Sequence, residues 1–195
     1  MKKSKPEIYV SFTFFAAAAF FLSGELFENY LYAVLFSFLH ETGHIISMLV
    51  FGAKPDCITL DISGIKISKN EMSLSFVEEC VVSISGPLVN LVFMLIFVSD
   101  KDSLAFIINA GLFFINILPV KSLDGGRFVF YIVSHFKNEK TAIKVIFVLE
   151  IITIIFIFTL LIMLFFANRV NSSVVLFTVM LVVMIVAEYL NNNCF

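Results

Sequence analysis

Residues 30–52 read YLYAVLFSFLHETGHIISMLVFG, and this stretch decides how the rest of the chain is interpreted. Apart from HETGH at residues 40–44, its length and composition are typical of a helix that crosses a membrane. Two imidazoles and a carboxylate inside hydrocarbon are costly and are rarely found there without a polar function. The stretch therefore predicts either a metal site or polar contacts that join one helix to another.

The composition predicts an integral membrane protein. The chain has 195 residues, of which 60% are hydrophobic, whereas a soluble domain has roughly 45–50% apolar residues. The excess must face something other than water, and we expect it to face the lipid bilayer. The net charge of −2 and the absence of a basic stripe give no indication of a nucleic-acid partner. Three widely spaced cysteines indicate neither a disulfide framework nor a cysteine metal site.

Long apolar runs predict an all-α polytopic membrane protein that forms a single membrane domain over residues 1–195. About six transmembrane helices are expected, at residues 8–23, 30–52, 77–98, 103–121, 142–166 and 173–190. The basic segment MKKSK before the first run resembles the start of a signal peptide, but we expect no cleavage because no clear cleavage site follows.

The basic residues predict the orientation. With the amino terminus in the cytoplasm, six spans also put the carboxyl terminus there, and only Lys101 and Arg169 of the 13 Lys and Arg fall outside. This distribution fits the positive-inside rule.

The two histidines of HETGH are spaced to bind one ion. His40 and His44 lie one turn apart on the same face of a helix, and Glu41 follows His40 directly. H-E-x-x-H on a helix is a zinc-metalloprotease signature in which the Glu is the general base. The chain has three histidines, and two of them fall at this spacing in an apolar helix. Contacts between helices explain such a cluster poorly, so a metal site is favoured.

A catalytic zinc site usually has three protein ligands, and the sequence offers two candidates for the third. Asp124, in NAGLFFINILPVKSLDGGRFVFY at residues 109–131, is expected to close an apolar helix. Gly125 and Gly126 would then let the chain turn and direct the carboxylate back into the bundle. A surface turn explains Asp-Gly-Gly equally well. His135 is the rival ligand, although its charged neighbours favour a position at the membrane interface.

Two further features are candidates for holding an extended substrate. In DCITLDISGIKISKNEMSLSF, residues 56–76, apolar and polar residues alternate, and Gly64 shifts the phase. This predicts a short membrane-associated β-hairpin-like segment whose edge would take the substrate as a further strand, although a cytoplasmic surface loop is an alternative. Pro119 has no amide, so the Ile115 carbonyl is expected to lack its helical partner and to be available for a kink or for substrate.

Taken together, HETGH, SISGPLVN at residues 83–90 and NILPVKSLDGG at residues 116–126 closely resemble the motifs of the site-2 protease family of intramembrane zinc metalloproteases. The resemblance covers residues 30–127, which would form the three-helix catalytic core. It implies a single zinc ion bound by His40, His44 and Asp124, with Glu41 as the catalytic base and Asn116 near the substrate carbonyl or oxyanion. Its Gly-Pro-x-x-Asn element adds three candidate substrate-binding residues, Gly86, Pro87 and Asn90.

The predicted spans 8–23, 142–166 and 173–190 would be accessory helices. Six spans without a PDZ or CBS domain most resemble the small branch that includes the bacterial sporulation-factor processing protease. We therefore expect a multi-pass protein of a bacterial cell membrane that cleaves membrane-embedded or membrane-associated proteins near their cytoplasmic side. A regulatory membrane protein or a homo-oligomer is also expected.

Two alternatives stay open. They are a catalytically inactive relative that binds membrane segments and a metal transporter, since His and carboxylates can line ion paths. Glu150 and Glu188 match no motif and are assigned no catalytic role.

Overall fold

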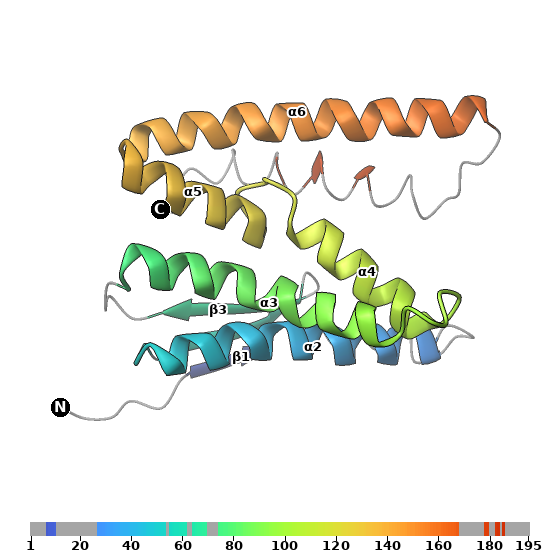
Figure 1. The fold of residues 1–195 in the computed structure, drawn as a ribbon, viewed down its shortest axis with the longest axis horizontal. Coiled ribbons are helices and arrows are strands. Elements are labelled where there is room, and N and C mark those ends of the chain that lie inside the picture. Colours follow the sequence, from blue (N-terminus) through green and yellow to red (C-terminus); the bar gives the residue numbers. More distant parts are fainter. Residues whose placement is uncertain are drawn as a thin grey trace. The chain divides into compact units, whose positions relative to one another are not determined.

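A computed structural model of the protein describes residues 7–10, 27–53, 55–61, 64–69 and 74–167, together with residues 178–179, 182–183 and 185. The chain divides into two compact units, Met1–Asn116 and Ile117–Phe195. The elements follow one another in the order β1 (Glu7–Val10), α2 (Phe27–Val50), β2 (Pro55–Asp61), β3 (Gly64–Lys69), α3 (Phe76–Ile96), α4 (Leu104–Asn116), α5 (Asp124–Phe136) and α6 (Glu139–Phe166) (Figure 1).

The first unit is built around α2 and α3, which lie side by side, with α4 packed against both (Figure 1). Small residues allow the close approach of α2 to α3. A Cβ at Gly43 would lie 2.8 Å from the Ser85 carbonyl oxygen, and the Ser47 and Ser85 hydroxyls are 2.9 Å apart. Aromatic contacts extend the same interface, where the rings of Phe36 and Phe93 meet edge to face.

Local signals set the ends of these helices. After α2, Gly52 adopts a positive φ of 76°, and the Ala53 and Gly52 amides donate to the Met48 and Leu49 carbonyls. This is a Schellman motif, in which glycine takes the left-handed conformation that other residues avoid. At the start of α3, Ser75 and Glu78 form a capping box. A small apolar cluster of Met48, Ala53 and Val82 joins the two helices near these ends.

The strands form a three-stranded sheet in the order β1-β2-β3. β2 pairs antiparallel with β3, and Asp61 lies opposite Gly64. Both strands lie largely within the segment whose alternating pattern predicted a hairpin-like structure. Gly64 begins the second strand, and the register irregularity is at Pro55 and Cys57.

The prediction of a membrane helix beginning at residue 8 is wrong. Residues 8–10 belong to β1, which pairs parallel with β2. Ile, Tyr and Val are β-branched or aromatic residues that suit a strand, and this pairing supplies backbone partners that the apolar run alone does not indicate. Residues 11–23 of the predicted span lie outside the described residues.

The second unit contains α5 and α6, preceded by the segment Ile117–Leu123. α6 begins at an N-cap, where the Asn138 side chain accepts a hydrogen bond of 2.8 Å from the Thr141 amide. Val120 and Ile185 form a buried apolar cluster, and Leu123 packs against it together with Ile154 and Ile157 of α6.

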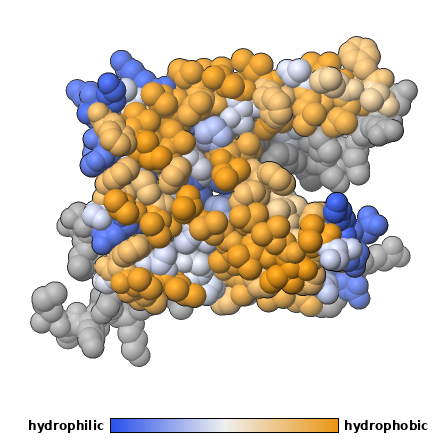
Figure 2. Space-filling view, in the orientation of Figure 1, coloured by the Kyte–Doolittle hydropathy of each residue, from blue (hydrophilic) through white to orange (hydrophobic). Residues whose placement is uncertain are grey.

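Within the described residues, three helices are long and apolar enough to cross a membrane, at Leu31–Val50, Phe76–Ile96 and Glu139–Phe166. Their exposed side chains are largely hydrophobic, and Figure 2 shows hydrophobic residues covering much of the visible helix surface. Such apolar exterior surface indicates an integral membrane protein. Of the predicted span at 173–190, only residues 178–179, 182–183 and 185 are among the described residues.

Two predictions about the region around Pro119 are also wrong. The helix expected at 103–121 ends at Asn116, because the residue before a proline disfavours the α conformation and proline has no amide to donate. Pro119 therefore does not kink a helix. Asp124 does not close a helix but begins α5, which has 13 residues.

Candidate metal centre

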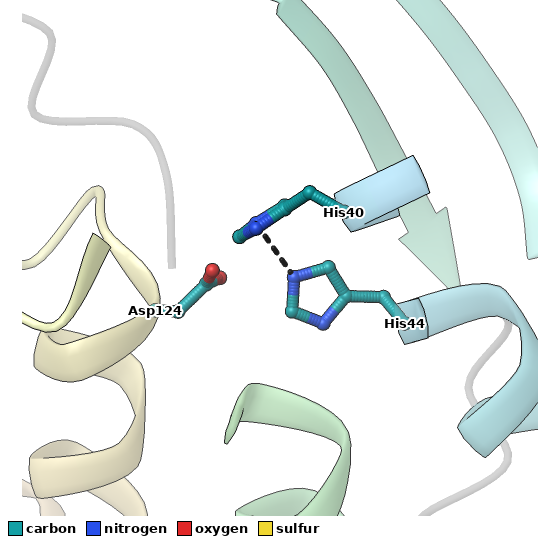
Figure 3. Close-up of side chains that lie close together, drawn as sticks. All are labelled: His40, His44 and Asp124. Atoms are coloured by element: carbon teal, nitrogen blue, oxygen red, sulfur yellow. Dashed lines mark hydrogen bonds between the residues drawn. The ribbon is translucent and has the colours of Figure 1, made fainter. Parts of the chain in front are cut away.

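The two histidines of the H-E-x-x-H motif meet inside the first unit. His40 and His44 project from successive turns of α2, and both are buried, with 5% and 8% of their surfaces exposed. Their Nε2 atoms face each other at 3.2 Å (Figure 3). Burial removes the water that would otherwise surround two polar nitrogens, so the contacts of the rings decide their chemistry.

The neighbouring helix α3 binds the other nitrogen of each ring. The Nδ1 of His44 lies 2.7 Å from the Val82 carbonyl oxygen, and the Nδ1 of His40 lies 2.5 Å from the Asn90 Oδ1. A carbonyl oxygen only accepts hydrogen bonds. His44 therefore carries its proton on Nδ1, and its Nε2 presents a lone pair when the ring is neutral.

The tautomer of His40 follows from a chain of hydrogen bonds that ends on a backbone carbonyl. The Ala105 carbonyl accepts from the Asn109 Nδ2 at 2.7 Å, which places the Asn109 Oδ1 toward Asn90. That oxygen accepts from the Asn90 Nδ2 at 3.0 Å, so the Asn90 Oδ1 faces His40. The Nδ1 of His40 must then be the donor, and its Nε2 also presents a lone pair.

Two buried lone pairs at this separation repel each other unless a positive charge lies between them. A proton shared by the two nitrogens or a metal ion would provide that charge. Zinc binds imidazole nitrogen at about 2.0–2.1 Å in tetrahedral geometry, which places two ligand nitrogens about 3.3 Å apart. The observed separation of 3.2 Å fits this value. Because both Nδ1 atoms are engaged, the rings are held in the state that a metal requires.

Gly86 lets the backbone of α3 approach the two imidazoles closely. A Cβ at this position would collide with the Nε2 of His44 and would lie 2.7 Å from the Nε2 of His40. Any side chain at position 86 would therefore press against the two nitrogens. The glycine of the Gly-Pro-x-x-Asn element thus lies against the histidines, where its lack of a side chain avoids a collision.

Asp124 lies in the second unit, at the start of α5 (Figure 3). Its surface is 6% exposed, and Arg127, one turn later, approaches its carboxylate at 4.0 Å. Gly125 and Gly126 adopt no positive φ. A Cβ at Gly125 would collide with the Ile117 carbonyl oxygen, and one at Gly126 with the Val120 carbonyl oxygen. The glycines therefore provide space for the preceding segment rather than an unusual turn.

The other predicted residues are distributed as follows. Glu41 is half-buried beside His40, and Pro87 is buried within α3. Asn116 ends α4, where its Nδ2 donates to the Leu112 carbonyl at 2.9 Å.

Gly64 begins β3. His135 lies in the last turn of α5.

Asn109 is a site residue that sequence reasoning missed. Its surface is fully buried, and its side chain fixes the orientation of Asn90. It belongs to none of the three motifs. The sequence did offer one indication, because Asn109 is an amide side chain in the middle of the apolar run LAFIINAGLFFIN. A polar group in such a helix is costly unless it has a hydrogen-bond partner.

Two comparisons with known proteins found matches to this chain. The model of Peptidase family M50 matches residues 102–163. The site-2 protease from Methanocaldococcus jannaschii has a similar structure, with a TM-score of 0.63 and 18% sequence identity over 93% of this chain and 90% of that chain. No curated protein matches the sequence.

The structural match shows a shared fold, and the family match covers the segment that contains Asp124. Together they bear out the resemblance to site-2 proteases that the three motifs indicated.

Proposed function

We propose that this chain is an intramembrane zinc endopeptidase that cleaves membrane-embedded or membrane-associated proteins. The observation that carries the proposal is the pair of buried Nε2 atoms, 3.2 Å apart, in rings whose Nδ1 atoms are both engaged. Apolar helices long enough to cross a membrane and the match to Peptidase family M50 support it.

The proposed metal ligands are His40, His44 and Asp124, three buried side chains of types that bind metal ions. Two imidazole nitrogens and one carboxylate oxygen form a donor set that suits zinc, with one position left for reaction. When bound, zinc supplies a Lewis acid that polarises a carbonyl group and makes water more acidic.

Glu41 and Asn116 would perform the remaining chemistry. The Glu41 carboxylate, next to His40 on α2, would take a proton from the attacking water and deliver it to the nitrogen of the departing amine. The Asn116 amide would donate a hydrogen bond to the oxygen of the scissile carbonyl as negative charge develops on it.

The position of the histidines along α2 supports cleavage near one membrane surface. At about 1.5 Å per residue, His40 and His44 lie about 20 and 26 Å from the first residue of a helix about 36 Å long. They are therefore nearer the end at Val50. β1, near the amino terminus, pairs with β2, which follows α2, so β1 lies on the side of the Val50 end. With the amino terminus in the cytoplasm, we infer that this end is cytoplasmic and that substrates are cut near the cytoplasmic side. The bilayer would surround the protein and its substrate. A regulatory membrane protein or a second copy would control the access of substrate to the site.

Co-expression with single-span membrane proteins tests the proposal. Wild type and Glu41→Gln are each expressed with such a substrate, and the products are separated by size. We expect a shorter product only with the wild type, because the amide cannot accept the proton from water, and loss of a general base lowers the rate by about 10²- to 10⁴-fold.

Two measurements complete this test. Glu28→Gln makes the same change in the exposed first turn of α2 and should cleave like the wild type. Purified Glu41→Gln protein should contain as much zinc as the wild type. Undiminished cleavage by Glu41→Gln would remove Glu41 from this role, and a wild type that binds zinc without cutting would indicate an inactive relative.

A further inference from the structure

Glu150 is a buried carboxylate that the proposed chemistry does not use. It lies in the middle of α6, a helix of 28 residues that is otherwise strongly apolar after its first two turns, and only 1% of its surface is exposed. An ionisable side chain at this depth costs several kcal/mol unless specific partners compensate it, so such residues are candidates for a function.

The Glu150 carboxylate binds the segment that leads to Asp124. Its Oε1 accepts a hydrogen bond of 2.8 Å from the Lys121 backbone amide, three residues before Asp124. Ile154 and Ile157 lie one and two turns further along α6 and pack in the cluster that contains the fully buried Val120. One face of α6 therefore contacts this segment through the Glu150 hydrogen bond and through an apolar cluster that contains Val120 and Ile185.

The segment is also fixed to the first turn of α5. The Ile117 and Val120 carbonyls lie so close to Gly125 and Gly126 that a Cβ at either glycine would collide with them. A displacement of the segment would therefore be transmitted to the turn that carries the Asp124 carboxylate. The backbone around Asp124 is held from two sides, by α5 itself and by α6.

We propose that Glu150 is a positioning residue for the metal ligand Asp124, acting through the Lys121 amide. α6 is then a part of the metal site rather than an accessory helix. This inference rests on the proposed function, because it assigns Asp124 to the metal. The role requires an acceptor atom at one place and not a negative charge as such, which separates it from an ordinary ion pair.

Zinc affinity of the purified protein in detergent, measured by competition with a chromophoric chelator, tests the inference. Glu150→Gln keeps an oxygen acceptor at the same reach and should bind zinc within about three-fold of the wild type, whereas Glu150→Leu should bind about 10- to 100-fold more weakly, the range typical of outer-shell partners. Glu150→Asp keeps the charge but shortens the side chain by one methylene, so we expect a loss of about 10-fold.

Thr153→Val is the matched control. It replaces another buried polar group on α6, whose hydroxyl donates to the Leu149 carbonyl of the same helix. We expect this variant to keep wild-type zinc affinity. Lys121→Ala removes the side chain but keeps the backbone donor and should do the same. Glu150→Leu is informative only if it folds, as judged by size-exclusion chromatography. If it does not, a higher zinc affinity in Glu150→Gln than in Glu150→Asp still supports the inference, and the reverse order contradicts it.

Equal losses in Glu150→Gln, Glu150→Leu and Lys121→Ala would show an ionic contact and overturn the inference. Wild-type affinity in both Glu150→Leu and Glu150→Asp would overturn it as well. In either case wild-type cleavage and zinc binding would leave the proposed protease intact. A wild type that binds no zinc would overturn the proposed function and this inference together.

Discussion

The two units hold their candidate ligands in different ways. In the first unit, His40 and His44 are fixed by side-chain hydrogen bonds to α3, and the contact of His40 continues through Asn90 and Asn109 to a carbonyl of α4. In the second unit, Asp124 is placed by the backbone, because the segment before it packs against α6 and against the first turn of α5.

This difference has a physical reason. An imidazole has two nitrogens and two neutral tautomers, so its ring must be oriented and its proton placed before it can bind a metal. A carboxylate needs only its position, since either oxygen can serve as a ligand. We therefore expect substitutions of side chains on α3 and α4 to affect the orientation of the histidines. Changes in the segment Ile117–Leu123 should instead affect the position of Asp124.

The largest effect is expected when a ligand is removed from either unit. His44→Ala and Asp124→Ala should each lose bound zinc and all detectable cleavage, because two remaining ligands do not hold the ion in a three-ligand site. Metal content by atomic emission and product formation from a single-span substrate measure this. Full zinc occupancy in Asp124→Ala would restrict the site to the first unit and contradict the proposed ligand set.

A smaller but still large effect is expected from one added methyl group. Gly86→Ala places a Cβ against both Nε2 atoms and should weaken zinc binding by about 100-fold, the upper end for changes around a metal ligand. Gly111→Ala on α4 is the control, because a Cβ there would meet no atom within 4 Å. Unchanged affinity in Gly86→Ala would mean that the two helices separate easily and that their close approach at Gly86 is not required.

The smallest effect is expected at the far end of the hydrogen-bond chain. Asn109→Leu removes the acceptor that orients Asn90, so the Asn90 amide can turn over and the His40 tautomer is no longer fixed. We expect zinc affinity to fall by about 10-fold and the nitrogen NMR signals of His40 to show a mixture of tautomers. A single Nδ1-protonated form in this variant would show that Asn90 alone sets the tautomer.

The sequence predicted the part of the site that lies within one turn of one helix. The spacing of His40 and His44 places both on one face of any α-helix, and the apolar flanks of residues 40–44 predict burial. The contact between His40 and Asn90 joins residues 50 positions apart. Its existence depends on how α2 packs on α3, which periodicity does not determine.

The region around Asp124 was harder to predict because two local signals conflict there. Apolar residues continue from α4 through residue 120, which favours one long helix, whereas Pro119 ends the helical conformation. The proline prevails, α4 stops at Asn116, and α5 begins at Asp124. β1 was missed for a related reason. A short apolar run does not distinguish a strand from the start of a membrane helix, because both contain similar residues.

The fixed tautomers also bear on how fast the site fills. Both rings are already oriented with their Nε2 atoms toward each other, so neither has to rotate before an ion arrives, and a proton shared between them leaves as the ion binds. The rate of loading should then depend on how quickly a dehydrated ion reaches α2 through the protein, rather than on rearrangement at the histidines. Release of the ion would require breaking its coordination bonds, because no alternative tautomer places a proton on Nε2 to compete with the metal. We therefore expect a long residence time for the bound ion.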